Sequence, residues 1–396
     1  MSWTIGAVGA AVLLGLFGVY IYTAVQPQKI SVPSVQTQQQ KTASPVSVTA
    51  RTLFFGDMYW GRYMNEWSMA SLLKTAYPFS RLNEFDRDEY DAWIANLECP
   101  TVAGFSQSSA QEDATLSFNC SPSYLPEAAK WFTIVSLANN HTDNRGAAGF
   151  AETRQHLDEN GIQYFGHYDP AVVDDACEVV GLPVTATYSD ATTKRQNLPV
   201  ALCAYNGVFK IPPAASIDAI RNYAALMPVI VMPHMGVEYQ PAPDALRIAT
   251  YHAMIDAGAD IILGGHPHWI QTTEAYKGKL IVYSMGNFIF DQQANKEVTR
   301  SAAIKVVINT TDASSDMLRQ WLAIGDDCTI FHDSCLDTIH AQHLSKLPFE
   351  YRFDAIGTNS ANKITKPATA AEQAEILQRL QWLKTMNQLQ APQGGL

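Results

Sequence analysis

Short apolar runs alternate with segments of helical periodicity along most of this chain. Runs that predict strands occupy residues 48–55, 93–97, 132–137, 200–204, 229–232, 260–263 and 280–283. Residues 146–159 and 244–257 instead repeat apolar side chains at helical spacing, and a glycine that can end a helix follows each of them. Alternation of this kind predicts a layered α/β domain in which helices cover a sheet.

The first residues have a different pattern. Residues 3–25 contain no charged side chain, and about 20 apolar helical residues suffice to cross a bilayer. No basic residue precedes this run and no clear cleavage site follows it, which favours an uncleaved anchor over a removed signal peptide. Residues 26–47 are rich in Gln, Ser, Thr and Pro, as expected of a flexible tether. The sequence thus predicts one N-terminal transmembrane helix in residues 1–25 and a tether in residues 26–47.

The remaining chain divides into a domain and a smaller C-terminal part. The domain is expected to span residues 48–325, and residues 326–396 to form an appendage. Its first part is a polar loop that contains two cysteines, Cys328 and Cys335. Residues 368–389 then place Ile376, Leu380 and Leu383 at helical spacing. We expect an amphipathic helix that docks its apolar stripe on the domain.

Charge and motifs exclude several classes of function. The formal net charge is −11 and no basic run is present, so nucleic acid, which attracts clustered Lys and Arg, is not an expected partner. The chain contains neither a Gly-x-x-x-x-Gly-Lys phosphate loop nor a Gly-x-Ser-x-Gly nucleophile elbow. An ATP-using polymer ligase and a serine hydrolase of that kind are therefore not expected.

Six cysteines follow the predicted anchor, and an even number favours an oxidising compartment. Neighbours along the chain suggest the pairs Cys99–Cys120, Cys177–Cys203 and Cys328–Cys335. Free thiols buried in apolar strands are the alternative for Cys177 and Cys203. We expect a single-pass protein of the cytoplasmic membrane whose domain lies outside the cytoplasm. Lys29, Lys41 and Arg51 follow the anchor and favour the opposite orientation, but long domains translocate largely regardless of such charges.

Polar groups that bind metals follow the ends of the predicted strands. The candidate ligands, in chain order, are Asp57, Glu98, Asn140, His234, His266 and His268. Loops after the carboxyl ends of strands meet at one edge of an α/β sheet, so these groups can converge on one point. Taken singly, a turn role for Asp57, a capping role for Glu98 or a core position for His234 explains each residue. Together, five strand ends with such groups predict a metal site.

The donor set indicates the chemistry. Carboxylate, amide oxygen and imidazole together suit Mn, Fe or Zn, as one or two ions. Such ions polarise a bound oxyanion and lower the pKa of a coordinated water to about 7. His141 follows Asn140 directly and is a candidate acid or electrophile. Arg62 is a candidate for bidentate binding of a phosphate or carboxylate, with an ordinary surface arginine as the alternative.

Six ordered motifs carry a family resemblance. They are Gly-Asp-x-x-x-Gly-Arg at 56–62, Asn-Leu-Glu at 96–98, Ala-Asn-Asn-His at 138–141, His-x-Gly-x-Glu-Tyr at 234–239, Gly-x-His-Pro-His at 264–268 and Tyr-Ser-x-Gly-Asn-Phe-x-x-Asp-Gln at 283–292. In this order they resemble the CapA family of poly-γ-glutamate capsule proteins. The resemblance implies a four-layer α/β/β/α metallophosphoesterase-like sandwich, a role in polymer synthesis or export, and metal ligation by the six candidate ligands with His141 beside them. It also implies an anionic polymer or phosphoester substrate and other membrane components of a capsule synthesis complex as partners.

The chain departs from the wider phosphoesterase class at one position and from the CapA family pattern at three others. That class begins with Asp-x-His, whereas Tyr59 stands in place of the histidine here. Asn144 replaces the usual aspartate of the Asn-Asn-His motif, Met235 replaces a tryptophan, and Gly265 replaces a histidine. Two functions stay open. Retention of the other ligands favours a metal-dependent hydrolase or transferase acting on a phosphoester or a polyglutamate amide, whereas the missing histidine favours a binding or scaffold component with a degenerate metal site.

Overall fold

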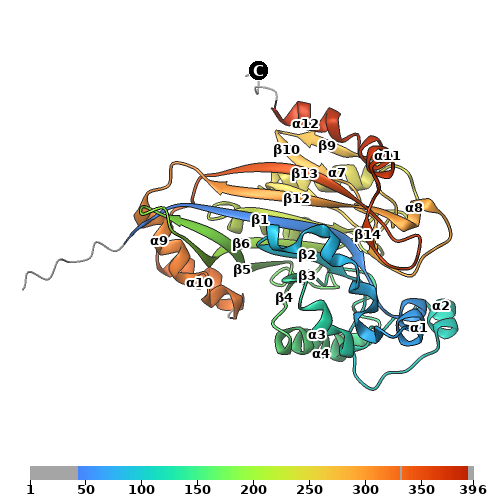
Figure 1. Ribbon diagram of the computed structural model, residues 1–396. Coiled ribbons are helices and arrows are strands. Elements are labelled where there is room, and N and C mark those ends of the chain that lie inside the picture. The colour runs from blue at the N-terminus through green and yellow to red at the C-terminus, as the bar shows by residue number, and fades with distance from the viewer. Residues whose placement is uncertain (1–42, 331, 391–396) are drawn as a thin grey trace, which may run out of the picture. The chain divides into compact units, whose positions relative to one another are not determined.

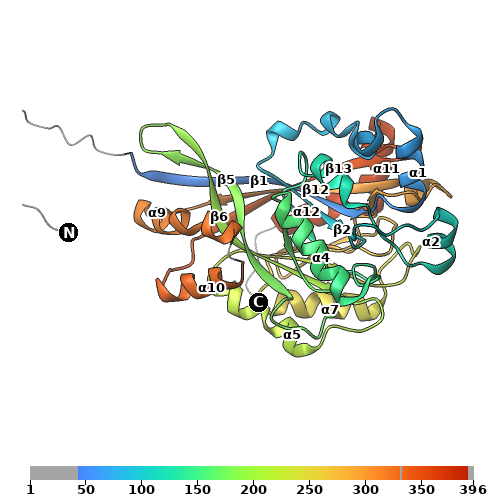
Figure 2. The same cartoon turned by 90° about the horizontal axis from the view of Figure 1, so that it is seen from below.

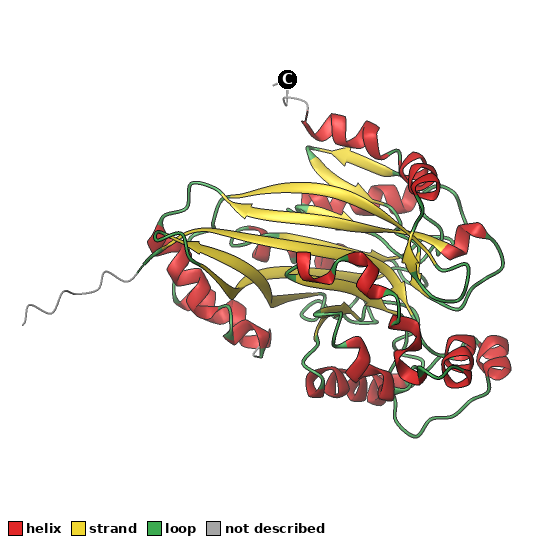
Figure 3. Cartoon of the chain, viewed as in Figure 1, coloured by secondary structure: helices red, strands yellow, loops and turns green. Residues whose placement is uncertain are grey.

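Residues 43–330 and 332–390 are described by a computed structural model, which has a mixed α/β fold with one large connected sheet. The predicted anchor in residues 1–25 and the tether up to residue 42 lie outside the described residues. Within the described part of the chain, no helix is both long and apolar enough to cross a bilayer. Figure 3 shows that the strands lie in the middle and the helices outside them.

The sheet contains both parallel and antiparallel strand pairs. Its main path, from one edge to the other, is β14 (Lys366–Pro367), β13 (Phe349–Asn359), β12 (Arg300–Thr310), β1 (Pro45–Met58), β5 (Cys177–Tyr188), β6 (Thr193–Asn206), β7 (Val229–His234), β8 (Ile261–Leu263), β10 (Lys279–Val282) and β9 (Thr273–Tyr276). Off this path, β2 (Ala92–Leu97) and β11 (Asn287–Ile289) pair with β1, and β3 (Ile134–Ser136) and β4 (Gln163–Phe165) continue from β2.

Strand β1 joins two sets of strands. Residues 45–54 of β1 pair antiparallel with β5 and β12, and residues 52–58 pair in parallel with β2 and β11. Alternate side chains of β1 enter different cores, because successive residues of a strand point to opposite faces. Phe54 packs in the core shared with β5–β8, whereas Leu53 and Phe55 pack in an aromatic core with Trp93. Both cores are therefore fixed by one strand, which ends at the candidate site.

Helices cover the strands on the outside. They are α1 (Arg62–Ala70), α2 (Ser109–Thr115), α3 (Leu125–Ala128), α4 (Gly146–Glu159), α5 (Ala214–Asp218), α6 (Ile220–Ala224), α7 (Ala245–Asp256), α8 (Lys296–Thr299), α9 (Ser315–Ile324), α10 (His332–Ala341), α11 (Ala370–Leu380) and α12 (Trp382–Gln390). The described residues also form short 3₁₀ segments: η1 (Lys74–Phe79), η2 (Leu82–Phe85), η3 (Arg87–Glu89), η4 (Pro122–Tyr124) and η5 (Asp327–Thr329). Figure 1 shows α3 and α4 beside β2–β4, and α11 and α12 beside β13 and β9.

The expected domain boundaries differ from those in the structure. Strand β1 begins at Pro45, because Pro45 and Ser47 already pair with Tyr188 and Thr187 at the end of β5, next to the turn of the β5–β6 hairpin (Figure 2). The folded unit therefore starts ahead of residue 48. Residues 326–390 are not a separate appendage, because β13 pairs with β12 along its whole length, from Phe349 to Asn359. The predicted long helix is two helices, α11 and α12, separated at Gln381, whose φ of 55° ends α11.

The three expected disulfides are present. They join Cys99 to Cys120, Cys177 to Cys203, and Cys328 to Cys335. Cys177 and Cys203 lie opposite each other on β5 and β6, which excludes the free-thiol alternative in this structure. The Cys99–Cys120 bond joins the residue that follows Glu98 to the segment just before η4. The Cys120 N–H also donates to the Pro100 carbonyl at 2.9 Å.

Removal of residues 326–396 should prevent folding. It would strip β13 from β12, expose an unpaired strand edge, and uncover buried side chains such as Ile304 and Val306. We expect the truncated chain to aggregate or to lose cooperative unfolding, as checked by size-exclusion chromatography and thermal circular dichroism against the full chain. A monodisperse, cooperatively unfolding product would show that these residues are an appendage after all.

Candidate metal centre

The centre lies where strands of the two sets end side by side. Asp57, near the end of β1, is flanked in register by Asn96 of β2 and Asn287 of β11. On the other set, His234 is the last residue of β7 and forms a bridge with Gly265, which follows β8. Parallel strands thus place their carboxyl ends, and the polar residues that follow, at one edge.

Asp57 is the best connected group. Its Oδ1 accepts a hydrogen bond from Asn96 Nδ2 at 2.9 Å, and its Oδ2 accepts one from the His266 N–H at 3.3 Å. His234 Nδ1 lies 3.5 Å from Oδ1, and His268 Nδ1 lies 3.5 Å from Oδ2. The side chain has no exposed surface. Both oxygens are therefore held in place by residues from three different segments, namely β2, the end of β7 and the loop after β8.

Glu98 is equally buried but is not satisfied by the protein. Neither carboxylate oxygen has a hydrogen-bond partner. The nearest cationic groups are His234 Nε2, at 3.4 Å from Oε1, and His268 Nε2, at 4.0 Å from the same oxygen. Burying a carboxylate without hydrogen bonds lowers the stability of the fold, so the unpaired oxygens of Glu98 indicate a binding position for a cation.

The two histidines of His266-Pro267-His268 enter the centre from a turn and not from a continuing strand. Strand β8 ends at Leu263, and His266 and His268 have positive φ values of 90° and 57°. Such backbone is strained for residues with a Cβ and is often found at functional sites. The two ring centroids lie 6.0 Å apart, and the buried His266 Nδ1 has no hydrogen-bond partner.

Asn140 reaches the same centre through its amide oxygen. Its Oδ1 lies 2.9 Å from His234 Nε2. The neighbouring Asn139 is fully buried and donates from Nδ2 to Asn96 Oδ1 and to the Leu97 carbonyl, at 3.0 and 2.8 Å. Asn139 therefore fixes the loop after β3 against β2, which positions Asn140 beside His234.

His141 is buried next to the centre without a direct contact to the carboxylates. Its ring stacks on Phe118 at 4.1 Å, and its Nδ1 lies 3.0 Å from Asn144 Oδ1. The Phe118 N–H donates to the same oxygen, so this oxygen is the acceptor and His141 Nδ1 is the donor. Burial lowers the pKa of His141 to about 3. The ring is thus neutral at pH 7 and offers Nε2 as an acceptor; its role as an acid or electrophile stays a prediction.

The ionisable groups of the centre divide into opposite charges. Burial opposes ionisation of Asp57, but hydrogen bonds and charge from His234 and His268 hold its pKa well below the ordinary value. Burial, followed by the charge of Asp57, raises the pKa of Glu98. Burial lowers the pKa of His234 and His268, yet the charges of Glu98 and Asp57 outweigh it and raise both pKa values to about 9. Burial, with the positive charges of His234 and His268, lowers the pKa of His266 to about 2.

The donor atoms fit a divalent cation. Ligand atoms of Glu98, His234 and His266 lie within 4.8 Å of one another, as do those of Asp57, Glu98 and His268. Both groups are buried and share Glu98. Imidazole nitrogens and carboxylate oxygens in this combination suit a first-row transition metal. The unpartnered Glu98 oxygens and His266 Nδ1 are the atoms that such an ion would satisfy.

Residues 51–292 match the family described as bacterial capsule synthesis protein PGA_cap. This chain belongs to that family. It is 30% identical over 283 residues to the PGA biosynthesis protein CapA of Bacillus subtilis. This match covers 68% of this chain and 70% of the relative. It is 29% identical over 296 residues to the capsule biosynthesis protein CapA of Bacillus anthracis, with 71% and 68% covered. A probable polyglutamine synthesis accessory protein of Mycobacterium tuberculosis is 28% identical over 200 residues, with 47% and 53% covered.

The CapA resemblance expected from the motifs is thus confirmed, and the structure assigns contacts to motif residues that sequence reasoning left without a role. Asn96 lies in β2, two residues before Glu98, and donates to Asp57 Oδ1 at 2.9 Å; in an extended chain this spacing favours one side for both side chains, so it was available as a signal. Asn287 Oδ1 lies 2.7 Å from His268 Nδ1 and so orients that ring. Asp291 is the third motif residue that sequence reasoning left without a role, and it pairs with Arg62.

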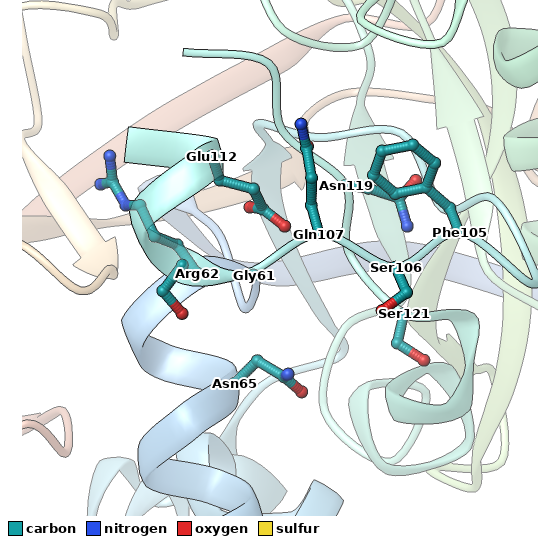
Figure 4. Close-up of a pocket in the computed structure, with 10 residues that line it drawn as sticks. Gly61, Arg62, Asn65, Phe105, Ser106, Gln107, Glu112, Asn119 and Ser121 are labelled. Carbon is teal, nitrogen blue, oxygen red and sulfur yellow. The ribbon is translucent and has the colours of Figure 1, made fainter. Parts of the chain in front are cut away.

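Arg62 is not free to clamp a ligand as predicted. Its Nε and NH2 donate to the two oxygens of Asp291 at 2.7 Å each, and its NH1 donates to Asp113 at 3.0 Å. The guanidinium fork is therefore occupied, and the pair with the fully buried Asp291 side chain locks α1 to the loop after β11. Arg62 also lines a polar pocket between α1 and the segment from Phe105 to Ser121 (Figure 4).

Loss of a single histidine should reduce metal binding. Replacement by alanine in His234→Ala or His266→Ala should lower the affinity for Mn, Fe or Zn by at least about 10–100-fold, the scale found even for groups that only orient ligands. Elemental analysis after purification without chelator measures the loss, and thermal unfolding checks the fold. His252→Ala is the matched control, because His252 Nε2 lies 3.0 Å from Glu274 Oε2 and neither residue belongs to the candidate ligands. Wild-type metal content in both test variants would contradict the ligand assignment.

Metal affinity and metal-free stability should respond to pH in opposite directions. The raised pKa of about 9 means that His234 and His268 are protonated at pH 7 without metal. Metal must displace these protons, so apparent affinity should rise about tenfold per pH unit for each proton released, up to about pH 9. The same protons stabilise the metal-free fold fully below the unfolded value near 6.5, and this stability is lost as pH rises through about 9.

Chelator competition at pH 6, 7.5 and 9, and denaturant unfolding of the metal-free chain at the same values, would measure both trends. An affinity that does not change with pH would contradict ligation by His234 and His268.

Proposed function

We propose that this chain is a metal-dependent hydrolase or transferase that acts in the synthesis or export of a capsule polymer such as poly-γ-glutamate. The observation that supports this most is Glu98, whose two buried oxygens have no hydrogen-bond partner and whose Oε1 lies near His234 and His268. The names of the Bacillus relatives, capsule biosynthesis and PGA biosynthesis protein CapA, support the polymer. We infer a phosphoester or a polyglutamate amide as the bond cleaved or transferred.

In this proposal Asp57, Glu98, His234, His266 and His268 hold one or two ions of Mn, Fe or Zn, and Asn140 adds an amide oxygen. Bound there, the metal supplies a nucleophilic water near neutral pH and polarises the oxygen of the bond under attack. His141 presents the Nε2 of a neutral imidazole, so we assign it a hydrogen bond from the attacking water. Asn144 and Phe118 hold its ring for that purpose.

The remaining expectations enter the same proposal. We propose that the two strand sets, which share a core and carry helices outside, form the four-layer α/β/β/α sandwich of metallophosphoesterases. We also propose a cytoplasmic-membrane anchor in residues 1–25, a domain outside the cytoplasm, and association with other membrane components of a capsule synthesis complex. Three disulfides support an oxidising compartment.

A scaffold function with a degenerate site is the second candidate. One observation favours it: Tyr59, which stands where the wider class has a histidine, donates to Glu112 at 2.6 Å and packs against Phe118. A ligand is thereby missing from the expected two-metal pattern. The name of the mycobacterial relative, an accessory protein, agrees with this alternative.

Hydrolysis by the metal-loaded full chain distinguishes the two functions. The probes are bis(p-nitrophenyl) phosphate for the phosphoester and a γ-linked glutamate trimer for the amide, each with Mn or Zn. His141→Ala should keep its metal and lose about 100-fold in rate, the scale of a lost general base; His252→Ala should match wild type. A metal-loaded wild type that cleaves neither probe would favour the scaffold, and a wild type without metal or metal-induced thermal stabilisation would refute a working centre.

A further inference from the structure

Tyr239 lies at the exposed side of the metal centre. Its side chain is 40% exposed, and its ring lies 5.8 Å from the ring of His268 at an interplanar angle of 31°. Its N–H donates to the Pro267 carbonyl, between the two histidines, at 2.9 Å. Its φ of 57° is unfavourable for a residue with a large side chain. The backbone is therefore held in strained geometry that places this phenol beside a metal ligand.

A chain of hydrogen bonds connects His268 to this phenol, and its direction is fixed by a main-chain carbonyl. Asn287 Nδ2 donates to the Val298 carbonyl at 3.2 Å, which can only accept. The amide orientation of Asn287 is thereby settled, so its Oδ1 accepts from His268 Nδ1 at 2.7 Å. In its neutral form His268 therefore keeps its proton on Nδ1, and Nε2 is the nitrogen whose lone pair could bind a metal.

The same chain continues outward to Tyr239. Asn287 Nδ2 also donates to Gln292 Oε1 at 3.0 Å, so the Gln292 amide has its oxygen on that side. Gln292 Nε2 then donates to the Tyr239 hydroxyl at 2.8 Å. Because the hydroxyl oxygen accepts this bond, its own proton points elsewhere. Tyr239 is thus oriented as a donor whose partner is not supplied by Gln292.

The charges around Tyr239 define what that partner is. Glu238 is 42% exposed, and its Oε1 lies 3.9 Å from His268 Nε2. Together with Asp57 and Glu98 it gives the centre three carboxylates, which without metal are offset only by the protonated His234 and His268. A bound divalent cation is a concentrated positive charge in the same place and attracts anionic oxygen directly. A phosphoryl or carboxylate oxygen would then meet both the cation and the Tyr239 O–H.

We propose that Tyr239 is a substrate-binding residue that donates its hydroxyl proton to an anionic oxygen of a ligand at the metal centre, with Asn287 and Gln292 as positioning residues. This inference rests on the metal-dependent function proposed above and adds the recognised group. Phosphoester and glutamate carboxylate are two sources of the same chemistry. Binding of either should require the metal.

The first test removes only the hydroxyl. Tyr239→Phe keeps the ring beside His268, so the zinc content and thermal stability of the full chain should match wild type. Its zinc-loaded form should bind inorganic phosphate or a γ-linked glutamate trimer roughly tenfold to a hundredfold more weakly, as for loss of a hydrogen bond to a charged acceptor. Isothermal titration with each probe, with and without zinc, measures this. Tyr276→Phe is the matched control, because its hydroxyl contacts Asp256 on α7.

The second test reverses one link. Gln292→Glu still accepts from Asn287 but turns an acceptor toward Tyr239, so the phenol proton should turn to it and away from the ligand. Added negative charge also weakens anion binding, and the Tyr239→Phe/Gln292→Glu double variant isolates that effect. Less-than-additive losses in the cycle support the relay.

The outcomes separate the two proposals. A zinc-loaded wild type that binds a probe, with weaker binding in Tyr239→Phe alone of the two tyrosine variants, supports the inference, and the probe that binds identifies the source. Equal binding by wild type and Tyr239→Phe, additive losses in the cycle, or binding of neither probe by the zinc-loaded protein overturns it and leaves metal binding intact. A wild type that takes up no zinc overturns the proposed function, and this inference falls with it.

Discussion

The constraint on which this structure depends is the burial of two carboxylates in one place. Moving a charged carboxylate from water into the protein interior costs roughly several kcal/mol even after the protein relaxes. Each of the two carboxylates must therefore be compensated by hydrogen bonds or by positive charge. Asp57 is compensated by Asn96, by the His266 N–H and by two imidazoles. Glu98 has only the imidazoles, at 3.4 and 4.0 Å, and no hydrogen bond. The centre therefore needs positive charge, supplied by protons on histidine or by a metal, and the histidine positions follow from that need.

Backbone must approach closely for these groups to meet, and two glycines permit it. A Cβ at Gly56 would overlap the Gly286 carbonyl, which accepts the Asp57 N–H at 3.1 Å. A Cβ at Gly265 would lie 2.8 Å from Asp57 Oδ1 and 3.4 Å from His234 Nδ1. The family motif has a histidine at residue 265, so this chain gains close packing of Asp57 against the loop after β8 where that motif has a further imidazole.

The strands that end at the centre could be predicted from the local sequence, because an apolar run followed by a polar group is visible without knowing the fold. Strand β13 was not predicted. Its alternation of aromatic and charged residues is typical of a strand with one face in water, but its partner β12 lies far away along the chain. The Arg62–Asp291 pair spans 229 residues, so a free arginine was the natural expectation. The turn of His266 and His268 into positive φ likewise follows from long-range contacts, such as that from the His266 N–H to Asp57, which no local pattern contains.

Tyr59 shows how the centre can lose one ligand and keep its shape. Strand β1 continues to Met58, and the Tyr59 N–H then donates to the Ile289 carbonyl at 2.7 Å, so the backbone is fixed whatever side chain follows. The phenol is used in the aromatic core, against Phe118 and Phe290, and is satisfied by Glu112. The ligand groups that remain still overlap at Glu98, which belongs to both. Each of the two donor groups is therefore complete among the described residues without a ligand at position 59, and Glu98 is the residue that connects them.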